Sequence, residues 1–163
     1  MKRLLLALVF TFCASWAAAD DRKALVGVWR YADEVDTKVD GSPAPTPAIS
    51  DTQGLLIYTA DGFMSIVHMP TNRTWLAETA SIGELRETVA NGNAYAGRYE
   101  VDPTTHTITH ITSVSMEPAF QGKRLTRSYI LQGNTLKLLG TFPYEGDTIH
   151  FTITWIRVEK SRK

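Results

Sequence analysis

Residues 125–142 read Leu-Thr-Arg-Ser-Tyr-Ile-Leu-Gln-Gly-Asn-Thr-Leu-Lys-Leu-Leu-Gly-Thr-Phe. Apolar and polar side chains alternate on both sides of Gly133-Asn134, which is the pattern of half-buried β-strands. Glycine and asparagine tolerate the positive backbone angles of a two-residue hairpin turn. This turn places Tyr129 opposite Leu138, and directly opposed residues share one face of a sheet. The same count places Arg127 opposite Gly140, so the stretch predicts a hairpin with one buried face.

The rest of the chain repeats this pattern. Eight short β-type runs, bounded by turn residues, lie at residues 25–32, 54–60, 63–69, 94–101, 106–116, 123–132, 135–142 and 148–158. Segment 81–90 favours a helix, because Ser81 and Glu84 have the spacing of a capping box. Closing such a sheet removes its exposed edges. The sequence therefore predicts an all-β fold, an eight-stranded antiparallel up-and-down β-barrel with one short helix, closed by pairing 148–158 with 25–32. A β-sandwich is the competing architecture.

Two further turns give expected pairings. Asp61-Gly62 reads as a two-residue hairpin turn that places Ala60 opposite Phe63. A four-residue loop at 102–105 would place Gly97 opposite His110. Alternation along the later strands assigns these residues to the barrel interior: Tyr95, Gly97, Tyr99, Val101, Ile108, His110, Thr112, Val114, Met116, Leu125, Arg127, Tyr129, Leu131, Leu136, Leu138, Gly140, Phe142, Ile149, Phe151, Ile153 and Trp155. The hairpin at 54–69 is apolar on both faces, so the sequence does not orient it.

The N-terminus has the features of a signal peptide. A basic start is followed by a short apolar run and by Ala17-Ala18-Ala19, the small residues that signal peptidase requires. We expect residues 1–19 to be removed and residues 20–163 to form one domain, secreted or periplasmic. The single cysteine, Cys13, lies in the leader, so the mature chain has no disulfide or cysteine metal site. With a formal net charge near zero, neither a nucleic acid nor a stable membrane insertion is expected as a partner.

Few polar side chains fall on the predicted inner face. We take six as candidate ligand-binding residues, because a few convergent polar groups in an apolar pocket are typical of a ligand site: Tyr95, Tyr99, His110, Thr112, Arg127 and Tyr129. An inward arginine is costly unless it meets an anion. Arg127 therefore binds either an acidic group of a ligand or a structural partner such as Glu100 or Glu117.

The sequence leaves two roles open for His110 as well. Histidine suits proton transfer near neutral pH, so His110 is a candidate general base or ligand contact, or else a core histidine satisfied by a tyrosine or backbone group. His106 shares its face, but four residues along a strand span roughly 13 Å, too far for one shared metal ion. No metal site and no cofactor are expected.

Several stretches together resemble the lipocalin-like domain family, a bacterial and fungal group of small barrels. They are Leu25-Val26-Gly27-Val28-Trp29-Arg30, Gly54-Leu55-Leu56-Ile57-Tyr58-Thr59-Ala60-Asp61-Gly62-Phe63-Met64-Ser65, Tyr95-Ala96-Gly97-Arg98-Tyr99-Glu100-Val101-Asp102, Thr107-Ile108-Thr109-His110, Arg127-Ser128-Tyr129 and Trp155-Ile156-Arg157. The resemblance implies structural roles for Gly27, Trp29 and Arg157, with the tryptophan plugging the closed end under the arginine. This chain departs from the family pattern at Ile111 and Ser128, where many members carry a second histidine and a second arginine.

These observations favour an exported protein that binds a small, mainly hydrophobic molecule inside the barrel, and Arg127 suits a ligand with an acidic group. Two other functions stay open. One is a small isomerase or cyclase that works in the barrel through His110, Arg127 and a tyrosine, an analogy that rests on fold alone. The other is a protein-interaction module that uses the proline-rich loop at 40–47.

Overall fold

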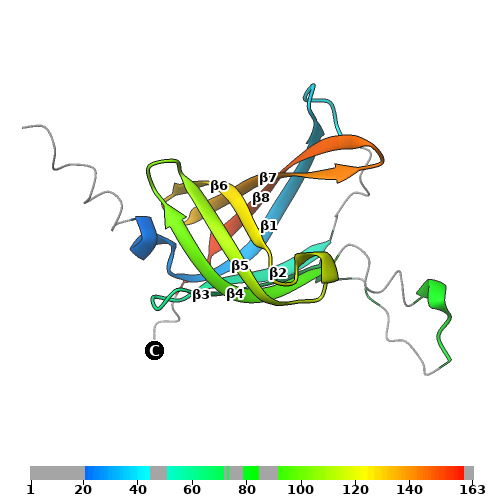
Figure 1. Ribbon diagram of the computed structural model, residues 1–163, viewed down its shortest axis with the longest axis horizontal. Helices are drawn as coiled ribbons and strands as arrows, with labels where there is room; N and C mark the ends of the chain where they lie inside the picture. The colour runs from blue at the N-terminus through cyan, green and yellow to red at the C-terminus, as the bar shows by residue number, and fades with distance from the viewer. Residues whose placement is uncertain (1–20, 45–50, 72, 74–78, 85–91, 160–163) are drawn as a thin grey trace, which may run out of the picture.

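A computed structural model describes residues 21–44, 51–71, 73, 79–84 and 92–159. The signal peptide expected at 1–19 and most of the helix expected at 81–90 lie outside these residues. Eight strands form a closed antiparallel barrel in which each strand pairs with its neighbours in the sequence and β8 pairs with β1. Their bounds are β1 (Gly27–Lys38), β2 (Thr52–Tyr58), β3 (Phe63–Pro70), β4 (Asn93–Asp102), β5 (Thr107–Ser115), β6 (Arg124–Gln132), β7 (Thr135–Tyr144) and β8 (Asp147–Arg157). Figure 1 shows these strands wrapped into one barrel.

The closure of the barrel and the β6–β7 hairpin are as predicted. β8 pairs with β1 from Trp29 opposite Arg157 onward, which excludes an open sheet or a sandwich. In the β6–β7 hairpin, Tyr129 lies opposite Leu138, and Gly133 adopts the positive φ that the turn requires. The expected capping box is present, because the Glu84 side chain accepts hydrogen bonds from the Ser81 backbone and hydroxyl. No helix within the described ranges is long and apolar enough to cross a membrane.

The first hairpin has a different turn from the predicted one. Tyr58 lies opposite Met64, and the Thr59 backbone N–H donates to the Phe63 carbonyl, so three residues form the loop instead of two. The Thr59 hydroxyl also accepts a hydrogen bond from the Phe63 N–H at 3.0 Å, which fixes the longer turn. This register orients the hairpin: Leu56, Tyr58, Met64, Ile66 and His68 lie inside the barrel, and their neighbours lie outside.

The β4–β5 hairpin also corrects the sequence reading. Tyr99, and not Gly97, lies opposite His110, a shift of two residues that keeps the predicted faces. Between Gly97 and Ala96 the register shifts again at a β-bulge, because Gly97 lies opposite Thr112 and Ala96 lies opposite Val114. In such a bulge, two residues of one strand oppose one residue of the other. A side chain on Gly97 would overlap the carbonyl oxygen of Ile111, so glycine allows this close approach. The bulge turns Val114 and Met116 outward, although alternation assigned both to the interior.

β1 continues well beyond residue 32, where the sequence reading ended it. Its register against β8 shifts between Tyr31 and Asp33. After this bulge, Glu34 and Asp36 lie opposite the inward-facing Ile153 and Phe151, whereas Val35 is 52% exposed. The segment therefore carries carboxylates on its inner face and an apolar residue on its outer face. Because the charged side chains face inward and the apolar side chain faces outward, the sequence alone does not identify this segment as a strand.

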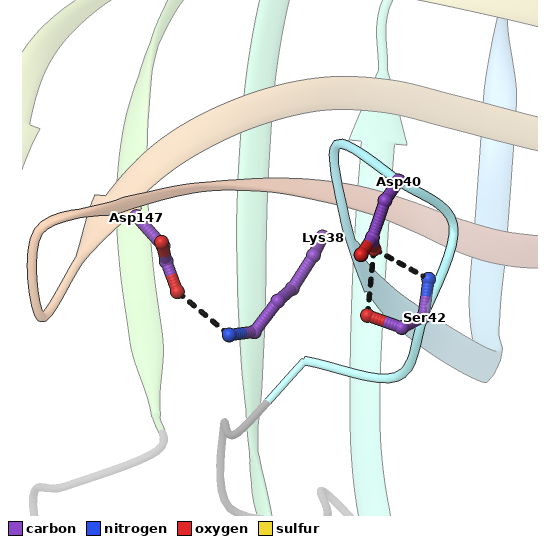
Figure 2. A network of polar contacts seen from close by, with 4 residues as sticks. All are labelled: Lys38, Asp40, Ser42 and Asp147. Carbon is purple, nitrogen blue, oxygen red and sulfur yellow. Dashed lines mark hydrogen bonds and ion pairs between the residues drawn. The ribbon is translucent and has the colours of Figure 1, made fainter.

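The far end of β1 is tied to β8 and to its own turn. Lys38 Nζ lies 2.8 Å from the Asp147 carboxylate, an ion pair that is drawn as a dashed line in Figure 2. Beside it, one Asp40 carboxylate oxygen accepts hydrogen bonds from the Ser42 backbone N–H and hydroxyl, and these bonds hold the pKa of Asp40 below its usual value. Exposed ion pairs of this kind add little stability. The Asp40 contacts instead hold the tight turn that follows β1.

The opposite end of the barrel is closed by residues 21–25, which form a helical turn, visible in blue in Figure 1. Leu25 and Trp29 are fully buried there, and Trp29 Nε1 donates to the Leu25 carbonyl at 2.9 Å. The Arg157 guanidinium lies over the Trp29 ring, 4.0 Å from its centroid, and donates to the Val26 and Ala24 carbonyls. Gly27 has a φ of 144°, and a side chain there would meet Arg157 at 2.7 Å. Glycine is therefore required beside the arginine.

Candidate functional site

A cavity of about 300 Å³ lies within the barrel, toward the end away from Trp29. Eight of its wall residues are apolar: Ile66, Phe120, Leu125, Leu138, Phe142, Pro143, Phe151 and Ile153. Its polar wall residues are His68, Asn93, Tyr95, Arg127 and Thr141. Phe120 comes from the short 3-10 helix η1 (Pro118–Phe120), which follows β5. The volume is at the lower end of the range for small-molecule sites, about 300 to 1,000 Å³.

Arg127 brings a positive charge to the wall of this cavity. Its guanidinium carbon lies 5.1 Å from the centroid of the Phe151 ring, and Gly140 leaves room beside its side chain. Among the described residues it forms no ion pair. Glu100 pairs instead with Arg124 at 2.5 Å, and the Glu117 carboxylate caps η1 by accepting from the Ala119 N–H. Neither structural partner considered from the sequence therefore neutralises Arg127.

His110 is fully buried behind the cavity wall and does not line the cavity. Its Nε2 lies 2.7 Å from the Tyr58 hydroxyl, and its Nδ1 lies 2.9 Å from the Tyr95 hydroxyl. Burial, helped by the positive charge of Arg127, lowers the pKa of His110 to about 3. Burial also raises the pKa values of Tyr58 and Tyr95. At neutral pH all three groups are uncharged, and only Tyr95 reaches the cavity.

The other three candidate residues lie elsewhere in the barrel. The Tyr99 hydroxyl donates to the Thr59 carbonyl at 2.8 Å, and the Tyr129 hydroxyl donates to Asp21 at 2.6 Å, close to the closed end. The Thr112 hydroxyl bonds to the backbone of Phe120 and Lys123, and so fixes the loop around η1. Of the six candidates, the structure brings only Tyr95 and Arg127 to the cavity wall, with His110 directly behind Tyr95.

His68 and Asn93 were missed by the sequence reading. They lie opposite each other on β3 and β4, and both line the cavity. Buried atoms of both side chains, His68 Nδ1 and Asn93 Oδ1, have no hydrogen-bond partner. Burial lowers the pKa of His68 to about 4, so its ring is neutral at physiological pH. Only the register of the first hairpin places His68 inside, and that register did not follow from the sequence.

A second titratable group lies near His68 on β1. The Tyr31 ring stacks on the His68 ring at 5.9 Å between centroids, and the Tyr31 hydroxyl approaches Glu34 at 3.4 Å. Burial, together with the nearby charge of Asp36, raises the pKa of Glu34 to about 7. The inner face of β1 thus holds a carboxyl group that is partly protonated at neutral pH.

These groups predict how folding stability depends on pH. Unfolded histidine binds a proton below a pH of about 6.5, whereas folded His68 and His110 stay neutral down to about 4 and about 3. Their contribution to stability is therefore present above pH ~6.5 and is lost as the pH falls. Glu34 acts in the opposite sense, because its raised pKa stabilises the folded state most at low pH and this benefit fades as the pH rises through about 7.

Near pH 5.5 the unfolded state binds about two more protons than the folded state at His68 and His110, whereas the folded state binds about one more at Glu34. In total, the unfolded state therefore holds about one proton more than the folded state. We expect the free energy of unfolding, measured in urea, to rise from pH 4.5 to 6.5 by about 1.4 kcal/mol per pH unit for each excess proton. Glu34→Gln removes the opposing group and should steepen the slope. A flat profile in the wild-type protein, or a shallower one in the variant, would contradict these assignments.

The outer surface has a larger but different hollow. It measures about 440 Å³ and lies over β2 and β3, lined by outward-facing residues such as Leu55, Ile57 and Val67. Leu55 and Val67 are exposed. The inner cavity is the better candidate site, because it lies inside the barrel and its wall residues include His68 and Asn93, whose buried polar atoms lack partners.

Comparison with known proteins agrees with this fold. A search of curated proteins finds no match. The family described as lipocalin-like domain matches residues 26–158, which is most of the chain and includes all of the strands from β1 to β8. With this match over most of its length and a closed eight-stranded antiparallel barrel, the chain belongs to the lipocalin-like domain family.

Proposed function

We propose that this protein is exported and holds a small, mainly hydrophobic ligand with an acidic group inside its barrel. The proposal rests chiefly on one observation: the apolar cavity contains Arg127, which forms no ion pair within the described part of the chain. A buried or half-buried charge without a counter-ion is costly. A ligand that brings an anion to Arg127 and apolar surface to Phe142 and Phe151 satisfies both parts of this wall.

The unpaired atoms of His68 and Asn93 support the same proposal. Buried polar groups in folded proteins nearly always have a hydrogen-bond partner, so each exception needs an explanation. Both atoms belong to residues that line the cavity. A polar group on the ligand, or a water that the ligand carries with it, is the partner we propose for them.

The site supports binding better than catalysis. A general base should have a pKa near the working pH, and the pKa of His110 is lowered to about 3 by burial. The imidazole is also separated from the cavity by Tyr95. The raised pKa of Tyr95 makes its hydroxyl a stable hydrogen-bond donor and a poor acid at neutral pH. An isomerase or cyclase that uses His110 directly is therefore disfavoured.

Native mass spectrometry of protein purified from its own host tests the proposal. We expect a mass excess of one small organic molecule, which is lost on denaturation. Leu125→Trp places an indole in the cavity and should remove the excess. Ile130→Trp is the matched control, because Ile130 is exposed on the outer face of the same strand. No excess in the wild-type protein, or an excess that persists in Leu125→Trp, would overturn the proposal.

A further inference from the structure

Three residues form a buried chain of hydrogen bonds that ends at the cavity. Tyr58 on β2 is bonded to His110 Nε2, and His110 Nδ1 is bonded to Tyr95 on β4. Tyr58 and His110 are completely buried, and neither lines the cavity. Tyr95 is the member of the chain that the cavity reaches. The series of hydrogen bonds therefore runs from Tyr58 through His110 to Tyr95, and Tyr95 borders the cavity.

Counting protons fixes the direction of these bonds. Within the described residues, the Tyr58 hydroxyl has His110 Nε2 as its only hydrogen-bond partner, so its proton must be donated there if it is to be satisfied. A neutral imidazole that accepts at Nε2 carries its proton on Nδ1. His110 Nδ1–H then donates to the Tyr95 oxygen. The proton of the Tyr95 hydroxyl has no acceptor left in this chain of bonds and is free for the cavity.

We propose that Tyr58 and His110 are positioning residues that make Tyr95 a fixed hydrogen-bond donor to the cavity, and that Tyr95 and Arg127 together bind a carboxylate of the ligand. This inference rests on the proposed function and specifies the ligand class: an apolar molecule with a carboxylate at one end. His110, a candidate base on sequence grounds, acts here through Tyr95 and does not touch the ligand.

Several observations select a carboxylate. Arg127 offers the planar donor fork that matches two carboxylate oxygens, and Tyr95 adds one further donor on the same cavity wall. No aspartate or glutamate is among the residues that line the cavity. Tyr95 and Arg127 line the same cavity, so we assign the two donors to one site.

The first test needs no ligand. In protein labelled with ¹⁵N at histidine, the ring nitrogens report directly which of them carries the proton. We expect His110 to be protonated at Nδ1 in the wild-type protein. In Tyr58→Phe the hydroxyl that donates to Nε2 is lost. The hydroxyl of Tyr95 is a better donor than an imidazole N–H, so we expect its proton to rotate toward His110 and to be donated to Nδ1. His110 should then be protonated at Nε2. A wild-type protein with the proton on Nε2 would overturn the inference even if ligands bind as proposed.

The second test measures decanoate binding by titration calorimetry. Tyr58→Phe should weaken decanoate about tenfold, the loss expected for one hydrogen bond to a charged group, although Tyr58 never touches the ligand. Tyr95→Phe should weaken it equally, and the double variant should be no weaker than either. Tyr31→Phe is the control, because its hydroxyl is directed to Glu34 and not to this chain of bonds. Additive losses, or an unchanged affinity in a folded Tyr58→Phe, would contradict the inference. Failure of decanoate to bind the wild-type protein would count against the proposed function instead.

Discussion

Trp29→Ala should lower the free energy of unfolding by about 3–5 kcal/mol, as truncation of a large buried aromatic does. The ring is fully buried, its Nε1 bonds to the Leu25 carbonyl, and Arg157 lies over its face. Removing it leaves a cavity, an unpaired carbonyl and a guanidinium without its aromatic partner. Chemical denaturation of the purified variant measures the loss.

Ligand affinity separates this structural role from a binding role. Trp29 does not line the cavity, so decanoate should bind the folded fraction of Trp29→Ala with nearly unchanged affinity. Arg30→Ala is the control for stability, because Arg30 is exposed on the outer face of the same strand and surface changes usually stay within about 0.5 kcal/mol. Strongly reduced binding with unchanged stability in Trp29→Ala would show that the tryptophan belongs to the site.

Arg127→Leu should weaken decanoate more than tenfold, equivalent to about 1.4 kcal/mol, while methyl decanoate should bind nearly as before. The variant removes the charge but keeps apolar contact with Phe151. Because Arg127 has no acidic partner in the described residues, the fold should tolerate the change or gain stability. Parallel titrations of the acid and its ester measure the difference.

The neighbouring arginine on β6 supplies the matched control. Arg124 is exposed and pairs with Glu100 on the outside of the barrel, so Arg124→Leu should leave both affinities unchanged. If Arg127→Leu weakens the acid and the ester alike, the charge is not what recognises the ligand. If Arg127→Leu melts much earlier than the wild-type protein, the arginine has a structural role.

The barrel could be predicted because its strands carry strong local patterns. On β6 and β7 the alternation and the Gly133-Asn134 turn agree, and the observed register follows from them. The end of β1 could not be predicted, because Glu34 and Asp36 face inward and Val35 faces outward. Alternation also failed in β5 beyond Thr112, which lies opposite Gly97, because a bulge there reverses the faces of the strand. A bulge depends on the contact between two strands, and neither strand alone encodes it.

The candidate site was predictable to a similar extent. Tyr95 and Arg127 reach the cavity because they lie on strands with clear alternation. Tyr99, Thr112 and Tyr129 share those inner faces but lie at other levels of the barrel, and the level depends on strand tilt and register. His68 was missed because its hairpin is apolar on both faces and its turn has one residue more than the Asp61-Gly62 pair suggested.

A crystal structure of the protein with decanoate tests the central claim most directly. The account predicts one decanoate in the inner cavity, with its alkyl chain against Phe142 and Phe151 and its carboxylate within hydrogen-bond distance of the Arg127 guanidinium and the Tyr95 hydroxyl. Decanoate bound only in the outer hollow over β2 and β3, or bound inside with its carboxylate away from Arg127, would contradict it.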